Sequence, residues 1–243
     1  MHIDITMKTR STIRECGVQI WGASLYLSDW ILSKLSQFQD AVVMELGAGV
    51  GLPGVVVARV CRRVFLTDYE DKSLRNCLRN VMLNDKRGVC SVRKLDWSDE
   101  FPIKKDEVKQ QSEFDWTEKE LMELKSCNYL LAADVIYSNE LTTSFLNKVV
   151  QILSICREDA KLIMTIEKRY NFTLPELCTT CREYDFFFSH VQVEGAGREE
   201  TCIGSAKTFL LRGKKLGSDF EKRLKEYDRS DEMELWELIR IPT

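Results

Sequence analysis

Short runs of apolar residues alternate along this chain with segments in which apolar positions recur at helical spacing. The first well-defined run covers residues 42–46, and closely spaced glycines follow it. Apolar residues resume at helical spacing over residues 52–58, so the pattern predicts a buried strand, a glycine turn and a helix. Glycine permits a positive φ and close contact with a ligand, and a helix N-terminus offers free N–H groups. We therefore expect a small molecule to bind at this turn.

The same alternation continues toward the C-terminus. Residues 98–126 interrupt it with a dense run of charge, which indicates a surface excursion, and Thr117-x-x-Glu120 within it is typical of a capping box at a short helix. The last two apolar segments have only a charged linker between them, so we expect an antiparallel hairpin. The further predicted strands are 64–68, 89–95, 129–134, 161–166, 208–211 and 234–239, and the predicted helices are 27–35, 74–84, 145–153 and 173–190.

The N-terminal part of the chain has a weaker pattern. Residues 3–20 alternate only loosely, and Trp21 stands where a strand would give way to the first helix. We expect residues 1–40 to form a strand and helix segment that packs on the core, and residues 41–243 to form the main domain. With 243 residues, of which 44% are hydrophobic, the chain is long enough to form one domain overall.

Composition and charge narrow the class of protein. The net charge of −3 gives no overall attraction to nucleic acid or to a membrane surface. The nine cysteines lack the spacing of a disulfide framework, Cys178-x-x-Cys181 has no second pair that would complete a metal site, and there are only two histidines. No apolar run reaches the roughly 18 residues of a membrane span. We expect a soluble intracellular monomer, in the nucleus or cytoplasm, without a metal.

The details of the glycine turn indicate which ligand it binds. A dinucleotide fingerprint requires glycine at the first, third and sixth positions, but the sixth position counted from Gly47 is Leu52. Acidic residues stand at three predicted strand ends in chain order: Glu45, Asp68 and Asp96. Ligands of open α/β sheets bind beyond the carboxyl ends of the strands, where carboxylates suit a ribose, an ammonium group and an adenine amine. A glycine turn without a ligand is the alternative interpretation.

These motifs resemble those of the class I, seven-β-strand protein-lysine methyltransferases that carry an Asp-x-x-Tyr motif, and the branch of methyltransferase-like protein 22 among them. The resemblance covers nearly the whole chain. It implies an α/β, Rossmann-like seven-stranded sheet with helices on both faces and a C-terminal antiparallel hairpin. The motifs that carry it are Trp21-Gly22, Glu45-Leu46-Gly47-Ala48-Gly49-x-Gly51-Leu52-Pro53-Gly54, Thr67-Asp68, Leu95-Asp96-Trp97, Asp134-Val135-Ile136-Tyr137, Glu167 to Leu174 and Glu234-Leu235-Trp236.

The resemblance implies S-adenosyl-L-methionine as cofactor, S-adenosyl-L-homocysteine as its product, and a protein that presents a lysine as substrate. Asp134 and Tyr137 would hold and aim the lysine amine. The implied cofactor contacts are Trp21, Glu45, Gly47, Ala48, Gly49, Asp68, Tyr69, Asp96, Trp97 and Ala133.

Three alternatives stand beside this hypothesis. The enzyme could methylate another nucleophile, although related enzymes that act on adenine or amide nitrogens carry Pro-Pro where this chain has Val135-Ile136. The chain could instead be a non-catalytic protein that binds the cofactor. A structural alternative for the motif itself is that Asp134 caps the next helix and Tyr137 packs beneath it.

Overall fold

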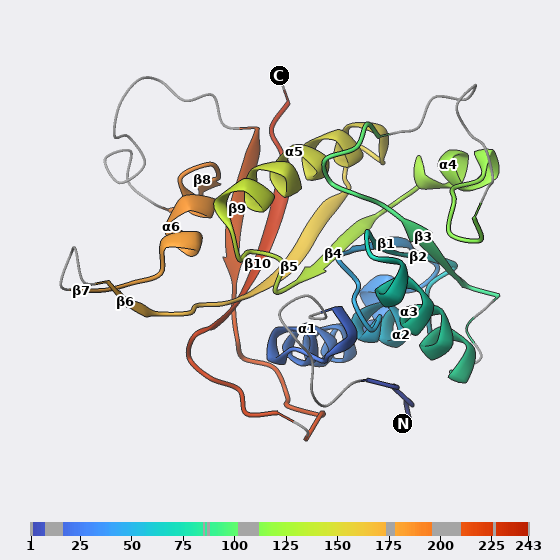
Figure 1. The fold of residues 1–243 in the computed structure, drawn as a ribbon, viewed down its shortest axis with the longest axis horizontal. Coiled ribbons are helices and arrows are strands. Elements are labelled where there is room, and N and C mark those ends of the chain that lie inside the picture. Colours follow the sequence, from blue (N-terminus) through green and yellow to red (C-terminus); the bar gives the residue numbers. More distant parts are fainter. Residues whose placement is uncertain are drawn as a thin grey trace.

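A computed structural model describes residues 2–7, 17–84, 86, 88–101, 112–173, 178–195, 210–225 and 227–242. Most strands belong to one eight-stranded sheet, in the order β3-β2-β1-β4-β5-β10-β9-β8 (Figure 1). Strands β1 to β5 are parallel, β10 is antiparallel to both of its neighbours, and β8 is parallel to β9. The bounds are β1 Val42–Leu46, β2 Arg63–Asp68, β3 Cys90–Lys94, β4 Tyr129–Ala133, β5 Lys161–Glu167, β8 Gln192–Val193, β9 Leu211–Leu216 and β10 Met233–Arg240.

Helices cover both faces of this sheet (Figure 1). On β1 the side chain of Val43 joins one apolar cluster while Val42 and Met44 join the other, because successive side chains of a strand point to opposite faces. The first cluster includes α1 Gly22–Ser33, α2 Leu52–Val57 and α3 Asp71–Leu83, and the second includes α4 Glu118–Leu124, α5 Asn139–Ile155 and α6 Arg182–Phe188. A short 3-10 helix, η2 Leu35–Phe38, follows α1. The central strands are therefore buried on both sides, which explains their continuous apolar runs.

The predicted fold class is confirmed, with corrections of detail. Residues 211–216 and 233–240 form the expected antiparallel hairpin, whereas residues 208–209 lie outside the described part. The sheet has one more strand than expected, because the two-residue β8 adds to the edge. The helix predicted over 173–190 begins only at Arg182, and a small separate sheet of β6 Asn171–Thr173 and β7 Cys178–Thr180 precedes it. Residues 2–7 and 17–20 form no strand, and residues 8–16 are not described.

Two buried polar groups fix the elements around the carboxyl ends of the strands. Thr165 of β5 donates its hydroxyl to the carbonyl of Ala23, 2.8 Å away, at the start of α1. Asp29 of α1 is fully buried and accepts hydrogen bonds from the backbone N–H groups of Arg223 and Leu224 and from the hydroxyl of Tyr227. The start of α1, where Trp21 lies, is thus held against the sheet, and the second half of α1 is held against the linker before β10.

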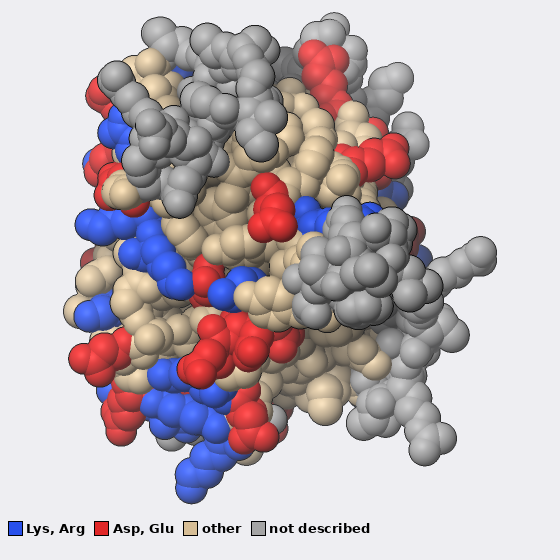
Figure 2. Space-filling view, turned by 90° about the vertical axis from the view of Figure 1, so that its left-hand side faces the viewer, with Lys and Arg blue, Asp and Glu red and all other residues tan. Residues whose placement is uncertain are grey.

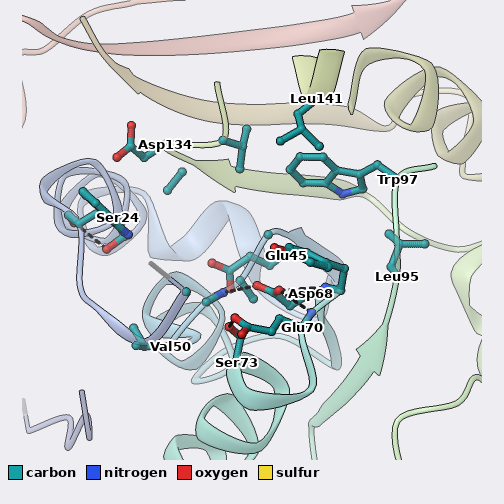
Figure 3. Close-up of a pocket in the computed structure, with 18 of the residues that line it drawn as sticks. Ser24, Glu45, Val50, Asp68, Glu70, Ser73, Leu95, Trp97, Asp134 and Leu141 are labelled. Atoms are coloured by element: carbon teal, nitrogen blue, oxygen red, sulfur yellow. Dashed lines mark hydrogen bonds between the residues drawn. The ribbon is translucent and has the colours of Figure 1, made fainter. Parts of the chain in front are cut away.

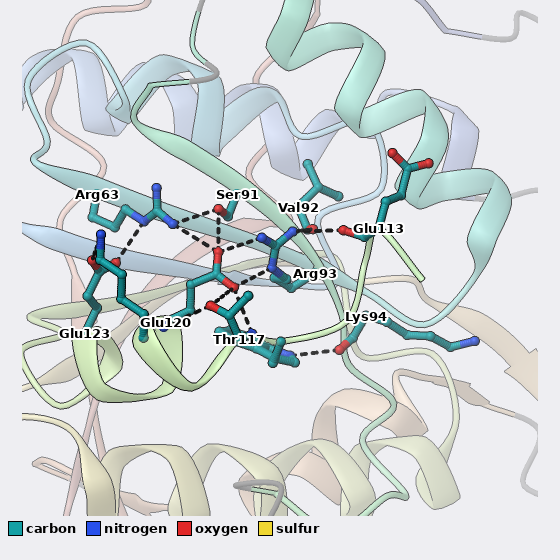
Figure 4. Close-up of polar contacts among 11 residues, drawn as sticks. Arg63, Ser91, Val92, Arg93, Lys94, Glu113, Thr117, Glu120 and Glu123 are labelled. Carbon is teal, nitrogen blue, oxygen red and sulfur yellow. Dashed lines mark hydrogen bonds and ion pairs between the residues drawn. The ribbon is translucent and has the colours of Figure 1, made fainter. Parts of the chain in front are cut away.

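A network of charged groups attaches α4 to the other end of the sheet (Figure 4). The predicted capping box is present, since Thr117 accepts from the Glu120 N–H and the Glu120 carboxylate accepts from the Thr117 N–H. The same carboxylate binds Arg63 of β2 at 3.0 Å and Arg93 of β3 at 2.6 Å, and it accepts from the hydroxyl of Ser91. Burial alone would raise the pKa of Glu120, but these hydrogen bonds lower it to about 2.

Among the helices of the described residues, none is long and apolar enough to cross a membrane.

Candidate active site

A cavity of about 290 Å³ opens at the carboxyl ends of the parallel strands (Figure 3). Every residue predicted from the sequence as a site residue lines it: Trp21, Glu45, Gly47, Ala48, Gly49, Asp68, Tyr69, Asp96, Trp97, Ala133, Asp134 and Tyr137. The cavity is also lined by residues that were not predicted as site residues: Gly17, Gln19, Ser24, Val50, Pro53, Glu70, Ser73, Leu95, Ser98, Val135 and Leu141. Lining residues thus come from segments far apart in the chain, which the fold of the sheet brings to one edge.

The glycine turn after β1 forms the floor of this cavity. Gly47 has φ of 65°, and a Cβ added there would lie 3.0 Å from Cγ1 of Val135 and 3.4 Å from the Trp97 ring. Gly49 has φ of 53°, and a Cβ there would lie 3.0 Å from the carbonyl oxygen of Gly17. Both positions require glycine, because a side chain is disfavoured at these φ values and space is lacking. The turn therefore brings the backbone close to whatever the cavity holds.

Glu45 lies beneath the turn and is almost completely buried. Its Oε2 accepts the N–H of Gly54 at 2.8 Å, in the first turn of α2, so the carboxylate satisfies one of the free donors of that helix. Burial raises the pKa of Glu45 to about 8, in spite of this hydrogen bond. The side chain has a structural role that the sequence analysis did not anticipate, and it also reaches the cavity.

Asp68, at the end of β2, organises the backbone on two sides. Its Oδ2 accepts the Gly49 N–H at 3.0 Å, and its Oδ1 accepts the N–H groups of Tyr69 at 2.8 Å and Glu70 at 3.2 Å. Burial raises its pKa, while these three hydrogen bonds favour the charged form. The carboxylate thus connects the glycine turn to the start of α3, where Glu70 and Ser73 form a further polar pair at 3.2 Å on the cavity wall.

Trp97 and Asp96 form the wall beyond β3. The Trp97 ring packs edge-on against Phe145 of α5 with 5.0 Å between ring centroids, and Oδ1 of Asp96 accepts the N–H of Ser98 at 2.9 Å. Figure 3 shows Trp97 and Leu141 together on one side of the cavity, opposite Glu70 and Ser73. Trp97 and Leu141 make this side of the cavity largely apolar, with Asp96 beside them, whereas Asp68 and Glu70 make the side formed by the start of α3 acidic.

Asp134 lies just past the end of β4, with a left-handed φ of 57°. Its side chain is only 4% exposed and forms an ion pair with Arg169, which follows β5. The guanidinium of Arg169 lies over the Trp21 ring, 5.4 Å from its centroid. Burial raises the pKa of Asp134, and the positive charge of Arg169 opposes this shift. Arg169 was not predicted as a site residue, although it lies within a motif that carries the family resemblance.

The capping alternative for this motif is wrong. Ser138 is the N-cap of α5, and its hydroxyl accepts the Leu141 N–H at 3.2 Å. Tyr137 is 47% exposed and lines the cavity, so it does not pack beneath the helix. Asp134 and Tyr137 thus both line the cavity, just before the N-terminus of α5.

The strand order, the acidic strand ends and the glycine turn together define the class I methyltransferase fold, whose members use S-adenosyl-L-methionine. Residues 2–188 match the model of the family described as lysine methyltransferase, and the chain belongs to that family.

Comparisons with two related sequences agree with this assignment, and a comparison with a solved structure concerns the fold alone. The chain is 32% identical over 250 residues to methyltransferase-like protein 22 of Mus musculus, across 100% of this chain and 60% of that protein. It is 29% identical over 146 residues to the protein-lysine N-methyltransferase EEF2KMT of Mus musculus, across 58% of this chain and 41% of the relative. A solved structure of an rRNA-methylase candidate from Clostridium thermocellum has the same fold, with a TM-score of 0.51, 12% identity and coverage of 92% of this chain and 98% of that chain. The chain therefore spans about three fifths of the length of its relative methyltransferase-like protein 22.

Proposed function

We propose that this protein transfers a methyl group from S-adenosyl-L-methionine to the ε-amine of a lysine in a protein substrate. The observation that carries the proposal is the position of Asp134 and Tyr137. Both line the same cavity as the predicted cofactor residues, and both follow β4, which lies beside β1 in the sheet. The family match and the likeness to a protein-lysine N-methyltransferase support a lysine acceptor.

The residues of the cavity fit this cofactor. S-adenosyl-L-methionine, when bound, supplies an electrophilic methyl group on a sulfonium. Asp68 and Glu70 offer carboxylate oxygens for ribose hydroxyls, Asp96 offers an acceptor for the adenine amine, and Trp97 offers an apolar wall for the ring. Glu45 offers a buried carboxyl group, whose charged form would pair with the ammonium group of the methionine end. A cavity built for a dinucleotide would need a helix N-terminus free for a pyrophosphate, whereas here Glu45 occupies the first turn of α2.

The remaining residues suit an amine acceptor. A lysine amine has an ordinary pKa near 10.4 and must be neutral before attack, so the enzyme has to hold, orient and deprotonate it. The Asp134 carboxylate attracts the ammonium form into a site that already receives a positive sulfonium, where like charges would otherwise repel. The Tyr137 hydroxyl provides a second polar contact at the mouth. Val135 and Ile136 are almost completely buried, which disfavours a stacking platform for a flipped base.

The charges on the surface support a protein substrate, and the cysteines support a location in the cytoplasm or nucleus. On the face shown in Figure 2, basic and acidic side chains of the described residues lie side by side and form no continuous basic surface, so a protein substrate is favoured over nucleic acid. Cys61, Cys77, Cys90 and Cys127 are buried free thiols, which is typical of a protein in the reducing environment of the cytoplasm or nucleus.

A methyl-transfer assay with product analysis tests the proposal. The protein is incubated with radiolabelled cofactor and fractionated lysate, and the labelled proteins are hydrolysed to identify the methylated amino acid. We expect methyl-lysine, and we expect Asp134→Ala and Tyr137→Phe to lower the rate about a hundredfold or more while S-adenosyl-L-homocysteine still binds. Asp159→Asn, in an exposed ion pair with Arg157, is the matched control and should keep the wild-type rate.

Three results would contradict the proposal. Label on a residue other than lysine would assign another nucleophile. Cofactor binding without any transfer would indicate a binding protein. A folded, cofactor-saturated Asp134→Ala variant that methylates lysine at the wild-type rate would remove Asp134 from the reaction.

A further inference from the structure

Arg169 reaches Asp134 because the two residues follow neighbouring parallel strands. In the register of β4 and β5, Ala133 pairs with Thr165, and the N–H of Asp134 donates to the carbonyl of Thr165 at 3.0 Å. The chain beyond β5 therefore runs beside Asp134, which follows β4 and lines the cavity. A side chain that reaches from residue 169 to Asp134 thus contacts a residue of the cavity wall.

Arg169 uses its guanidinium group in two ways, for ion pairs and for a contact with an aromatic ring. Its Nη2 binds Oδ2 of Asp134 and lies 3.7 Å from Oε2 of Glu167. The same guanidinium lies over the Trp21 ring. A planar guanidinium can donate from its edge while its face rests on an aromatic ring, which a lysine ammonium cannot do in the same way. Arg169 thereby links the carboxylate at the mouth to a tryptophan that lines the cofactor cavity.

The segment that carries Arg169 is anchored by the residue before it. The N–H of Lys168 donates to the carbonyl of Glu232 at 3.0 Å, and its ammonium lies 3.1 Å from Oε1 of Glu234. Glu234 is buried and also accepts hydrogen bonds from Tyr184 and Trp236. A shift of the backbone at Arg169 would disturb this network, so the contacts of Lys168 hold the backbone from which Arg169 reaches Asp134.

We propose that Arg169 is a positioning residue for methyl transfer, which holds the Asp134 carboxylate in one orientation and in its charged form at the mouth of the cavity. The inference rests on the proposed function, because Arg169 acts on the acceptor lysine through Asp134. The ion pair uses Oδ2, so within the described contacts Oδ1 of the same carboxylate remains for the lysine.

The charges around Asp134 support this role. Burial raises the pKa of Asp134, the Arg169 guanidinium lowers it, and the neighbouring Glu167 carboxylate raises it. Without Arg169, both remaining influences favour the protonated carboxyl, which cannot attract an ammonium group. Asp134 also has a left-handed φ, a conformation that persists only when surrounding contacts hold it. The N–H bond to Thr165 and the ion pair to Arg169 are two such contacts.

Two variants of Arg169 and one control test the proposal. Arg169→Ala removes the guanidinium, and Arg169→Lys keeps a positive charge but not the planar edge and face. Arg157→Met is the matched control, because Arg157 forms an exposed ion pair with Asp159 instead. Each protein is examined by calorimetry with S-adenosyl-L-homocysteine, by a carbon-detected titration of the Asp134 carboxyl, and by the pH profile of kcat/KM for methyl transfer.

For Arg169→Ala we expect kcat/KM to fall roughly ten- to a hundredfold, the loss that follows from one hydrogen bond to a charged group. The affinity for S-adenosyl-L-homocysteine should stay near that of the wild type. The pKa of Asp134 and the acidic limb of the pH profile should both move upward, and added millimolar guanidinium should restore part of the rate. Arg169→Lys should be intermediate, and Arg157→Met should behave as the wild type.

Two results would overturn the proposal. The first is an Arg169→Ala protein that binds the cofactor product normally and in which Asp134 titrates as in the wild type. The second is a loss of activity that guanidinium does not restore and that leaves the pH profile unmoved. If Arg169→Ala fails to fold, the same readouts on Arg169→Lys decide. The carboxyl titration needs no acceptor, so a wild-type protein that methylates no lysine would refute the proposed function and still leave the role of Arg169 measurable.

Discussion

Replacing Asp68 by asparagine tests two roles of this carboxylate, which are to hold the glycine turn and to bind the ribose of the cofactor. Asparagine has nearly the same shape and keeps one carbonyl oxygen, which can still accept the N–H groups of Tyr69 and Glu70. The position that faces the Gly49 N–H becomes an NH₂ group, which cannot accept. The variant therefore loses the negative charge and the hydrogen bond that ties the glycine turn to the end of β2, now 3.0 Å long.

The size of the effect follows from this single hydrogen bond. A hydrogen bond to a charged acceptor contributes about 1.5–3 kcal/mol. Burial raises the pKa of Asp68, so the cost of burying the charge offsets part of that contribution. We expect the free energy of unfolding to fall by about 2 kcal/mol, which corresponds to a Tm about 4–8 °C lower for a chain of this length. The ribose also loses its charged acceptor, so affinity for S-adenosyl-L-homocysteine should fall at least about tenfold.

Thermal unfolding and calorimetry, each with S-adenosyl-L-homocysteine, measure the two effects separately. Asp71→Asn is the matched control, since Asp71 lies three residues further on and forms exposed contacts with Lys94 and Arg75. The free energy of unfolding of this variant should differ from that of the wild type by less than about 1 kcal/mol. A wild-type Tm combined with weaker binding would show that Asp68 serves the ligand alone. A lower Tm with unchanged binding would show that it serves only the fold, and either result would refute the reasoning.

Two further predictions concern other buried carboxylates. Burial raises the pKa of Glu45 to about 8, and a cationic ligand favours its charged carboxylate. Cofactor binding should therefore release a proton, and the affinity should rise as the pH rises from about 6 to 8. Calorimetry in buffers of different ionisation enthalpy measures the released proton, and its absence would contradict this prediction. Glu120→Gln should lower the free energy of unfolding by about 1–3 kcal/mol without weakening cofactor binding. The lowered pKa of Glu120, about 2, means that its contribution is present above its unfolded pKa and is lost as the pH falls toward 2, so in urea unfolding the difference between variant and wild type should be smaller at about pH 3 than at pH 7.

The central sheet could be predicted because its strands are buried on both faces. Such strands have continuous apolar runs, and an acidic residue ends each of the runs of β1, β2, β4 and β5. Acidic residues at the ends of parallel strands must lie along one edge, which is why Glu45, Asp68 and Asp134 could be placed around one cavity before their distances were known. The short edge strand β8 could not be predicted, since two residues carry no periodic signal.

The hydrogen bonds that the site carboxylates accept from the backbone could not be predicted from the sequence. Glu45 accepts the N–H of Gly54 because the turn carries the chain back under β1. Asp68 accepts the N–H of Gly49 because β2 pairs with β1 and ends beside the turn. Spacing in the sequence shows that a carboxylate follows a strand, but not which backbone donors surround it. The helix predicted from residue 173 failed in a similar way, because Thr173 and Cys178–Thr180 belong to the pair of short strands before α6.

The role of Asp134 could have been narrowed from the sequence by attention to Ser138. Serine followed three residues later by an apolar residue that starts a helical pattern is a strong N-cap signal, and it leaves Asp134 one turn too early to cap α5. An aspartate whose nearly buried carboxylate caps no helix and whose φ is left-handed needs other partners to hold it. The guanidinium of Arg169, which follows β5, binds the carboxylate, and the carbonyl of Thr165 in β5 accepts the backbone N–H of Asp134. Their identity depends on the register between β4 and β5, which no local pattern encodes, so Arg169 enters the site only through the assembled sheet.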